Sequence, residues 1–279
     1  MDAREQLRIY LEQRREAGEH DLVLDQLDVD AVLALVGAKM NVAMSRAAPA
    51  EVPSMPSTPT TPSADWREVL RSSEAGLSVG TNDRELFGAL AHLATLDDIA
   101  RTVATCTRCP LYSTATNPVP GVGNPNADLM VVGEAPGQTE DEQGVPFVGA
   151  AGQLLTKILA AVDLKREDVF IVNVLKHRPP GNRNPMPDEV TACSPYLFRQ
   201  FELIRPKAIL ALGTFAAQTL LQTKLAIGKL RGQVHRFHGV PLIVTYHPAA
   251  LLRNPSWKRP TWEDVQLVRR ILDSPQPQS

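Results

Sequence analysis

Two cysteines that lie two residues apart, Cys106 and Cys109 in the stretch ATCTRCPLY, carry the most specific chemistry in this sequence. At this spacing a tight turn lets both thiolates face one metal ion or cluster. Where thiols stay reduced, such a pair is typical of a metal site or a redox site. The chain contains only three cysteines, and the third is Cys193. Because a closed metal site normally takes four ligands, a metal site here would need a fourth ligand of another type.

The remaining composition is ordinary for a soluble protein of one or two domains, with 279 residues and a high proline count of 23. No apolar run approaches the roughly 20 residues of a membrane span, and the charged start lacks a signal-peptide core. We therefore expect a cytoplasmic protein. Residues 1–100 carry 9 Lys and Arg against 17 Asp and Glu, whereas residues 101–279 carry 20 against 14. Only the second part has an excess of positive charge that would favour a polyanion such as DNA.

The chain before residue 96 divides into three segments. Residues 1–46 predict an acidic helical segment, with helices expected over 3–18 and 21–37. Residues 47–65 are rich in Pro, Ser and Thr and predict a linker, because they cannot bury enough apolar surface to fold. Residues 66–95 are ambiguous and partly helical in pattern. Binding of an unknown partner protein and plain disorder are both open for the N-terminal segment.

The second part of the chain alternates between strand and helix patterns. The expected strands are the apolar runs ADLMVVGEA, DVFIVNVLK, KAILALG and VPLIVTYHP, and the expected helices cover 149–162, 188–204, 214–223 and 261–272. This alternation predicts a three-layer α/β/α sandwich around a central four-stranded parallel sheet. Ligands bind such sheets beyond the carboxyl ends of the strands, and three of the four strand ends here are polar. We expect one domain over 96–273 and a disordered tail over 274–279.

Three motifs follow these strands in order: GEAPGQTEDEQGVPFVG, NVLKHRPPGNRNP and HPAALLRNP. The first is glycine-rich but matches neither a dinucleotide-binding fingerprint nor a P-loop. Together with the cysteine pair, the motifs resemble the iron–sulfur (family 4) uracil-DNA glycosylases over about residues 96–273. The resemblance implies a uracil-DNA glycosylase-like fold and a monofunctional enzyme that starts base-excision repair. Such an enzyme flips uracil out of DNA and hydrolyses its N-glycosidic bond with water.

The resemblance also implies roles for individual residues. Phe147 would stack on uracil, Asn173 would read the uracil edge, and His247 would stabilise negative charge at uracil O2. Four further residues match family positions near the uracil, the attacking water or the loop after the second strand: Glu134, Ala135, Glu140 and Asn182. Each of these residues also has a purely structural interpretation, such as core packing for Phe147 or a solvated charge for the glutamates.

The stretch HPAALLRNPSWKR suits contact with DNA. Leu251 and Leu252 could wedge into the space that a flipped base leaves, and Arg253, Lys258 and Arg259 could contact phosphates. The alternative is an ordinary hydrophobic helix start followed by a solvated basic segment.

The resemblance suggests the missing fourth ligand. Family members have cysteine after the lysine in KCRPP, whereas this chain reads KHRPP and places His177 there. The implied ligands of a 4Fe–4S cluster are thus Cys106, Cys109, His177 and Cys193, because histidine can ligate iron in clusters. The UdgX-like branch also has this histidine, but its inserted basic loop with a second histidine is missing here, so covalent trapping of DNA is not expected. Zinc is the alternative metal, since it accepts three cysteines and a histidine.

Two other functions are open. A non-catalytic protein could bind uracil or abasic sites in DNA, and an electron-transfer protein could use the cluster alone. The second leaves Phe147, Asn173 and His247 without a role. We expect the protein to act on uracil-containing DNA as a monomer and to have no membrane partner.

Overall fold

The computed structural model describes residues 76–80 and 90–274, which belong to one unit, Thr60–Ser279. The helices predicted over 3–18 and 21–37, the linker over 47–65 and nearly all of the tail lie outside the described residues. No helix among the described residues is long and apolar enough to cross a membrane.

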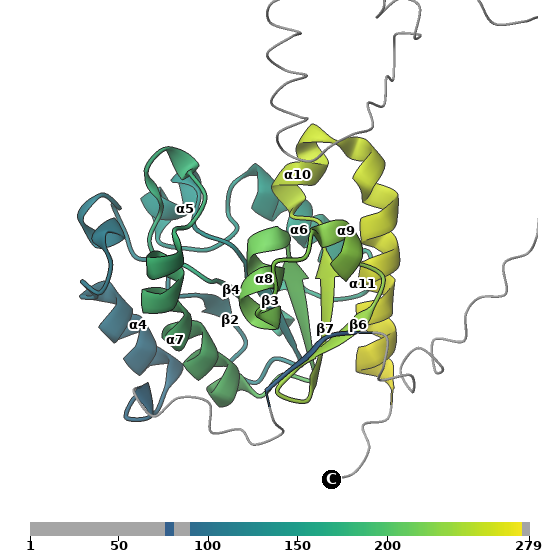
Figure 1. Cartoon of the computed structure of the whole chain (residues 1–279), viewed down its shortest axis with the longest axis horizontal. Helices are drawn as coiled ribbons and strands as arrows, with labels where there is room; N and C mark the ends of the chain where they lie inside the picture. The colour runs from purple at the N-terminus through teal and green to yellow at the C-terminus, as the bar shows by residue number, and fades with distance from the viewer. Residues whose placement is uncertain (1–75, 81–89, 275–279) are drawn as a thin grey trace, which may run out of the picture. The chain divides into compact units, whose positions relative to one another are not determined.

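The described chain forms a seven-stranded sheet in the order β1-β6-β7-β5-β3-β4-β2 (Figure 1). Its centre is the predicted set of four parallel strands, and their side chains are almost all buried. These strands are β3 (Leu129–Gly133), β4 (Phe170–Asn173), β5 (Ala208–Leu212) and β7 (Val240–Thr245). The predicted fold class is confirmed. Strands that are buried on both faces have continuous apolar sequences, which is why these four could be recognised.

Three short strands extend the sheet beyond the predicted four. They are β1 (Ser78–Val79), β2 (Val122–Gly123) and β6 (Val234–Phe237). β2 pairs antiparallel with β4, β6 pairs antiparallel with β7, and β1 pairs parallel with β6. Two-residue strands give no periodic signal, and β6 alternates between buried and half-buried side chains and contains a histidine and an arginine. These three strands therefore lack the continuous apolar sequence from which the four central strands were predicted.

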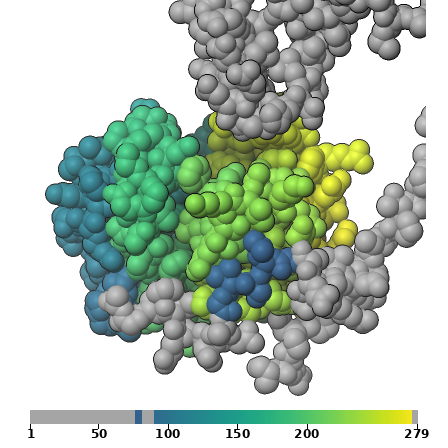
Figure 2. Space-filling model, in the orientation of Figure 1, coloured from purple at the N-terminus to yellow at the C-terminus, as the bar shows by residue number. Residues whose placement is uncertain are grey.

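Helices cover both faces of the sheet. The predicted helices correspond to α6 (Ala150–Ala160), α7 (Pro187–Ile204), α8 (Thr214–Leu221) and α11 (Lys258–Asp273), and a further helix, α4 (Leu96–Ala104), precedes them. One hydrophobic core joins α4, α7 and α8 to the sheet, and a second joins α6 and α11 to its other face. Figure 2 shows side chains of α4, α7 and α8 closing over the first face.

The folded unit starts before residue 96, where the domain boundary was predicted. β1 pairs with β6 at the sheet edge, and Leu90 and Leu93 are buried in the first core. In addition, the Arg199 guanidinium on α7 donates to the Leu93 carbonyl at 2.9 Å. A domain cut at residue 96 would remove these contacts.

Candidate active site

A pocket of about 380 Å³ opens where β3, β4 and β7 end. Its lining includes every residue that the resemblance implied for catalysis and base binding: Glu134, Ala135, Glu140, Phe147, Asn173, Asn182 and His247. These residues come from three loops far apart in the sequence. The parallel sheet brings them together because the carboxyl ends of its strands share one edge.

Phe147 reaches this pocket through an unusual backbone conformation. Its φ of 54° lies in the left-handed region, which a bulky residue rarely adopts, and its ring is 5% exposed. Two glycines make room for it. A Cβ at Gly133 would lie 2.5 Å from the Phe147 Cζ and 2.4 Å from Asn173 Oδ1, and one at Gly152 would lie 1.8 Å from the Phe147 carbonyl oxygen. Backbone strain of this kind gathers at functional sites.

The loop that carries Phe147 is fixed by two charged side chains. Glu140, on α5 (Gln138–Gln143), accepts hydrogen bonds at Oε1 from the backbone N–H groups of Val148 and Gly149, each at 2.9 Å. Arg166 donates to the Pro146 carbonyl at 2.6 Å. One oxygen of Glu140 is therefore committed to holding the loop in place.

Asn173 ends β4 and pairs in register with Gly133 at the end of β3. Its side chain is 1% exposed and lines the pocket, yet Oδ1 has no hydrogen-bond partner among the described residues. Leaving a buried acceptor unpaired costs roughly 1–3 kcal/mol, so such groups are rare without a ligand or a functional reason. The unpaired oxygen is suited to accept an N–H from a bound molecule.

His247 follows β7 and caps α10 (Pro248–Arg253). Its Nδ1 accepts the Ala249 N–H at 3.2 Å, so the proton of the neutral ring sits on Nε2. Burial lowers the His247 pKa to about 4, with Arg253 acting in the same direction and Glu140 opposing. The ring centroid lies 5.5 Å from that of Phe147. His247 is thus a neutral hydrogen-bond donor beside the aromatic wall of the pocket.

Glu134 contributes a carboxyl group to the same pocket. It follows Gly133 directly at the end of β3, and burial raises its pKa to about 7. A carboxyl with a pKa near neutrality can take up or release a proton at physiological pH, as general acid–base chemistry requires.

Asn182 lies in the loop after β4, within the short 3-10 turn Pro180–Asn182. Its φ is 54°, and its Oδ1 accepts from the Arg178 guanidinium at 2.7 Å. The side chain is exposed at the pocket rim, so it reaches solvent rather than a closed cavity.

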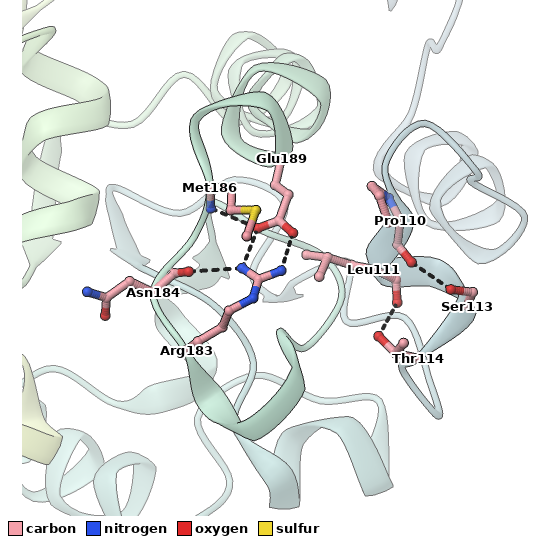
Figure 3. Close-up of polar contacts among 8 residues, drawn as sticks. All are labelled: Pro110, Leu111, Ser113, Thr114, Arg183, Asn184, Met186 and Glu189. Atoms are coloured by element: carbon pink, nitrogen blue, oxygen red, sulfur yellow. Dashed lines mark hydrogen bonds and ion pairs between the residues drawn. The ribbon is translucent and has the colours of Figure 1, made fainter.

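The same loop brings two residues to the pocket that sequence reasoning missed, Arg183 and Asn184. The Arg183 guanidinium donates to both oxygens of buried Glu189 on α7, at 2.9 and 2.6 Å, and to the Asn184 carbonyl at 3.0 Å (Figure 3). The Met186 N–H also donates to Glu189, at 2.8 Å. Glu189 therefore holds the rim of the pocket in place. The polar motif GNRNP is the sequence feature that could have identified Arg183 and Asn184 as pocket residues.

The two leucines predicted as a wedge differ in the structure. Leu251 is only 1% exposed and lines a crevice with Leu154 and Ile158 of α6, so its prediction as a DNA-contacting residue is wrong. Leu252 is 51% exposed. Neighbouring residues on a helix point about 100° apart, which turns one leucine into the core and the other outward.

The predicted basic residues are exposed. Arg253 lines the pocket, and Lys258 and Arg259 lie at the start of α11. Within the described part of the chain, these three residues form one ion pair. It joins Arg259 to Glu263 at 3.6 Å, and both side chains are exposed. An exposed pair is worth little and leaves Arg259 free to meet a phosphate.

The three cysteines gather beside α7. Cys193 Sγ accepts the Lys176 N–H at 3.2 Å, and the Tyr196 hydroxyl donates to Cys106 Sγ at 3.3 Å. Burial raises the pKa of Cys193 to about 11, and Cys109 and Cys106 act in the same direction whereas Lys176 opposes. Burial also raises the pKa of Cys109. Burial thus favours the thiol form of Cys109 and Cys193, and a bound cation would favour their thiolates.

His177 follows Lys176 directly and is 7% exposed. Burial lowers its pKa, with Asp141 opposing, so the imidazole is neutral near pH 7, the form that binds a metal. Among the described residues, no three His, Cys, Asp or Glu side chains are placed to hold a single metal ion. Three thiols and a neutral imidazole are donors that either an iron–sulfur cluster or a zinc ion accepts.

Comparisons with known proteins agree with this geometry. The model of the uracil DNA glycosylase superfamily matches residues 120–266. The type-4 uracil-DNA glycosylase of Archaeoglobus fulgidus is 46% identical over 193 residues, which are 66% of this chain and 97% of the relative. That of Thermotoga maritima is 42% identical over 63% of this chain and 94% of the relative. The type-5 enzyme of Pyrobaculum aerophilum is 32% identical over 62% and 90%. This chain belongs to the uracil DNA glycosylase superfamily.

Proposed function

We propose that this protein is a monofunctional type-4 uracil-DNA glycosylase that excises uracil from DNA by hydrolysis and so initiates base-excision repair. Relatives named type-4 enzymes, at 42% and 46% identity over nearly their whole length, support the assignment. The observation that carries it is the buried, unpaired Oδ1 of Asn173 in a pocket shared with Phe147 and a neutral His247.

These three side chains suit the uracil base. The Asn173 carboxamide accepts from uracil N3–H and donates to O4, whereas cytosine presents a lone pair and a donor at these places. Phe147 stacks on the ring, and His247 Nε2–H donates to O2. When the bond between N1 and C1′ breaks, its electron pair leaves with the base, so the donor at O2 stabilises the charge that develops.

Water is the proposed nucleophile. The residues that line the pocket include no lysine, so no amine is placed there to form a Schiff base. The water oxygen bonds to C1′ as uracil departs, and a proton of that water passes to a general base of the protein. Glu134 is the proposed acceptor, because its carboxyl group lies in the pocket and has a pKa of about 7.

Single-turnover excision should therefore depend on pH through Glu134. The raised pKa means that the carboxylate, the form that accepts a proton, predominates only above about pH 7. The rate should rise about tenfold per pH unit well below pH 7 and level off above it. Glu134→Gln should lower the plateau and remove this inflection, whereas Glu142→Gln, which alters an exposed residue, should keep both. A wild-type profile that is flat between pH 5 and pH 8 would contradict the role of Glu134.

We further propose that Cys106, Cys109, Cys193 and His177 hold a 4Fe–4S cluster, with the histidine ligand of the UdgX-like branch. When bound, the cluster would supply a covalent tie between three chain segments and a cation to share the thiolate charge. The chain's own part is to bring the segments together. Asp141 helps, because its carboxylate accepts the Thr116 N–H at 2.9 Å and so ties the segment after the cysteine pair to α5.

The purified protein should be brown and contain iron, and His177→Ala should lose iron or become insoluble. Iron content and the visible absorbance of the same sample measure this. His92→Ala, which alters an exposed histidine outside the described pocket, should keep the wild-type iron content. Zinc without iron in the wild-type protein would contradict the cluster, and unchanged iron in His177→Ala would show that another group is the fourth ligand.

Release of uracil from labelled oligonucleotides, in single and double strands, tests the function directly. DNA contact is assigned to Leu252, Arg253, Lys258 and Arg259, which are exposed near the pocket or at the start of α11. A folded, iron-containing protein that binds uracil-DNA tightly without releasing the base would instead favour the non-catalytic interpretation.

A further inference from the structure

A buried lysine, Lys176, links Cys193 to Asn173 and so connects the region of the three cysteines with the pocket. Lys176 is 1% exposed, and its Nζ donates to the Asn173 carbonyl at 2.7 Å and to Gln200 Oε1 at 2.9 Å. Both acceptors are neutral. No carboxylate among the described residues forms an ion pair with Lys176, and burying an amine in this way costs free energy, so the residue calls for a role.

The main chain of Lys176 makes two further hydrogen bonds. Its N–H donates to Cys193 Sγ at 3.2 Å, and its carbonyl accepts the Val119 N–H at 2.8 Å. Gln200, on α7 like Cys193, donates in turn to the Pro120 carbonyl at 2.7 Å. One residue therefore contacts a cysteine sulfur, the segment that follows the cysteine pair, and the backbone of the residue that lines the pocket.

We propose that Lys176 is a positioning residue that links the three cysteines to Asn173 and so fixes the position of the Asn173 carboxamide in the pocket. The region around the cysteines and the base-reading group then move as one unit. This inference rests on the proposed function. The Lys176 amine donates to the Asn173 carbonyl, and the side chain of the same asparagine lines the pocket. If the backbone shifts, Oδ1 shifts with it, and a misplacement of about 1 Å at an active site can cost roughly 100-fold in rate.

The test compares two DNA ligands of one sequence, one with a non-hydrolysable 2′-fluoro-2′-deoxyuridine and one with an abasic-site analogue. Only the first presents a base to Asn173, so the ratio of the two affinities reports base reading alone. Lys176→Met keeps the aliphatic volume but removes the donor. It should weaken binding of the uridine analogue about tenfold, with abasic-site binding and iron content unchanged.

A double substitution shows whether Lys176 acts through Asn173. In an Asn173→Ala background, Lys176→Met should cause no further loss of uridine-analogue binding. The matched control is Lys207→Met, because Lys207 is a surface lysine paired with Asp128 at 2.8 Å, and it should leave every measurement unchanged. Gln200→Leu, which removes one acceptor of the Lys176 amine, should give a loss of about threefold with the same dependence on Asn173. The Gln200→Leu variant replaces Lys176→Met in this test if Lys176→Met does not fold.

Equal losses for both DNA ligands, or the same loss with and without the Asn173 side chain, would overturn the proposal. So would loss of iron with an unchanged ratio of affinities, since Lys176 would then serve the cluster only. A wild-type protein that neither binds the uridine analogue nor releases uracil would overturn the proposed function, and with it this role. Failure of the function thus shows in the wild type, and failure of the positioning role shows in the variants.

Discussion

Replacing His247 with alanine should slow single-turnover uracil excision by about 100-fold to 1000-fold and barely change the affinity for uracil-containing DNA. The ring is held by the bond from the Ala249 N–H to Nδ1, which leaves the Nε2–H available as a donor to the proposed base. Burial keeps the His247 pKa at about 4, so the donor is neutral at working pH. Charge gathers on the base only as the bond breaks, and a donor to that charge therefore acts on the rate rather than on binding.

Two variants sharpen this experiment. His247→Gln places an amide donor at the same position and should recover part of the rate, whereas His92→Ala should behave as the wild type. Because His247 also caps α10, the dissociation constant for abasic-site DNA serves as a check that the DNA-facing surface is intact. If His247→Ala lost affinity and rate by the same factor, the residue would act in binding and not on the departing base.

The central fold could be predicted because it depends on burial. The four parallel strands are apolar on both faces, and helical periodicity marks their covering helices. The edges could not be predicted in the same way. β1 and β2 have two residues each, and they exist because a neighbouring strand offers unpaired backbone groups rather than because of their own sequence. The folded unit consequently begins earlier than composition suggested.

The motifs name residues that the fold brings to one pocket, but they do not give the geometry of that pocket. The motifs name Phe147, yet its left-handed backbone depends on the lack of a Cβ at Gly152, and the position of its ring depends on the lack of a Cβ at Gly133. The motifs also name Glu140, whose Oε1 is occupied by two backbone N–H groups. In addition, a six-residue helix carries too little periodic signal to show that Leu251 is the buried member of its pair.

Lys176 shows a different limit of sequence reasoning. It stands in the same motif as Asn173 and His177, where a lysine is usually interpreted as exposed or as DNA-binding. The structure buries it completely, with its amine on the Asn173 carbonyl and its N–H on Cys193. No periodicity or charge pattern predicts this, because the position follows from how α7 packs against the end of β4.

Asn173→Asp should reduce uracil excision about 100-fold or more near neutral pH, because a carboxylate cannot donate to uracil O4 and at least one buried polar group is left unpaired. Each such loss is typically about 1–3 kcal/mol, and the losses combine when several groups fail together. An ionised carboxylate would also lie close to the negative charge that develops on the base. Burial disfavours that ionised form, so lowering the pH should protonate the carboxylate that the substitution introduces and return a donor.

The measurement is single-turnover release of uracil and of cytosine from matched oligonucleotides between pH 5 and pH 8. The uracil rate of Asn173→Asp relative to the wild type should recover as the pH falls, and some cytosine release should appear when the new carboxyl group is protonated. Asn126→Asp adds the same charge at an exposed position outside the pocket and should keep the wild-type rate and selectivity. Wild-type uracil excision by Asn173→Asp across this range would show that another group reads the base, and the unpaired Oδ1 would then need a different explanation.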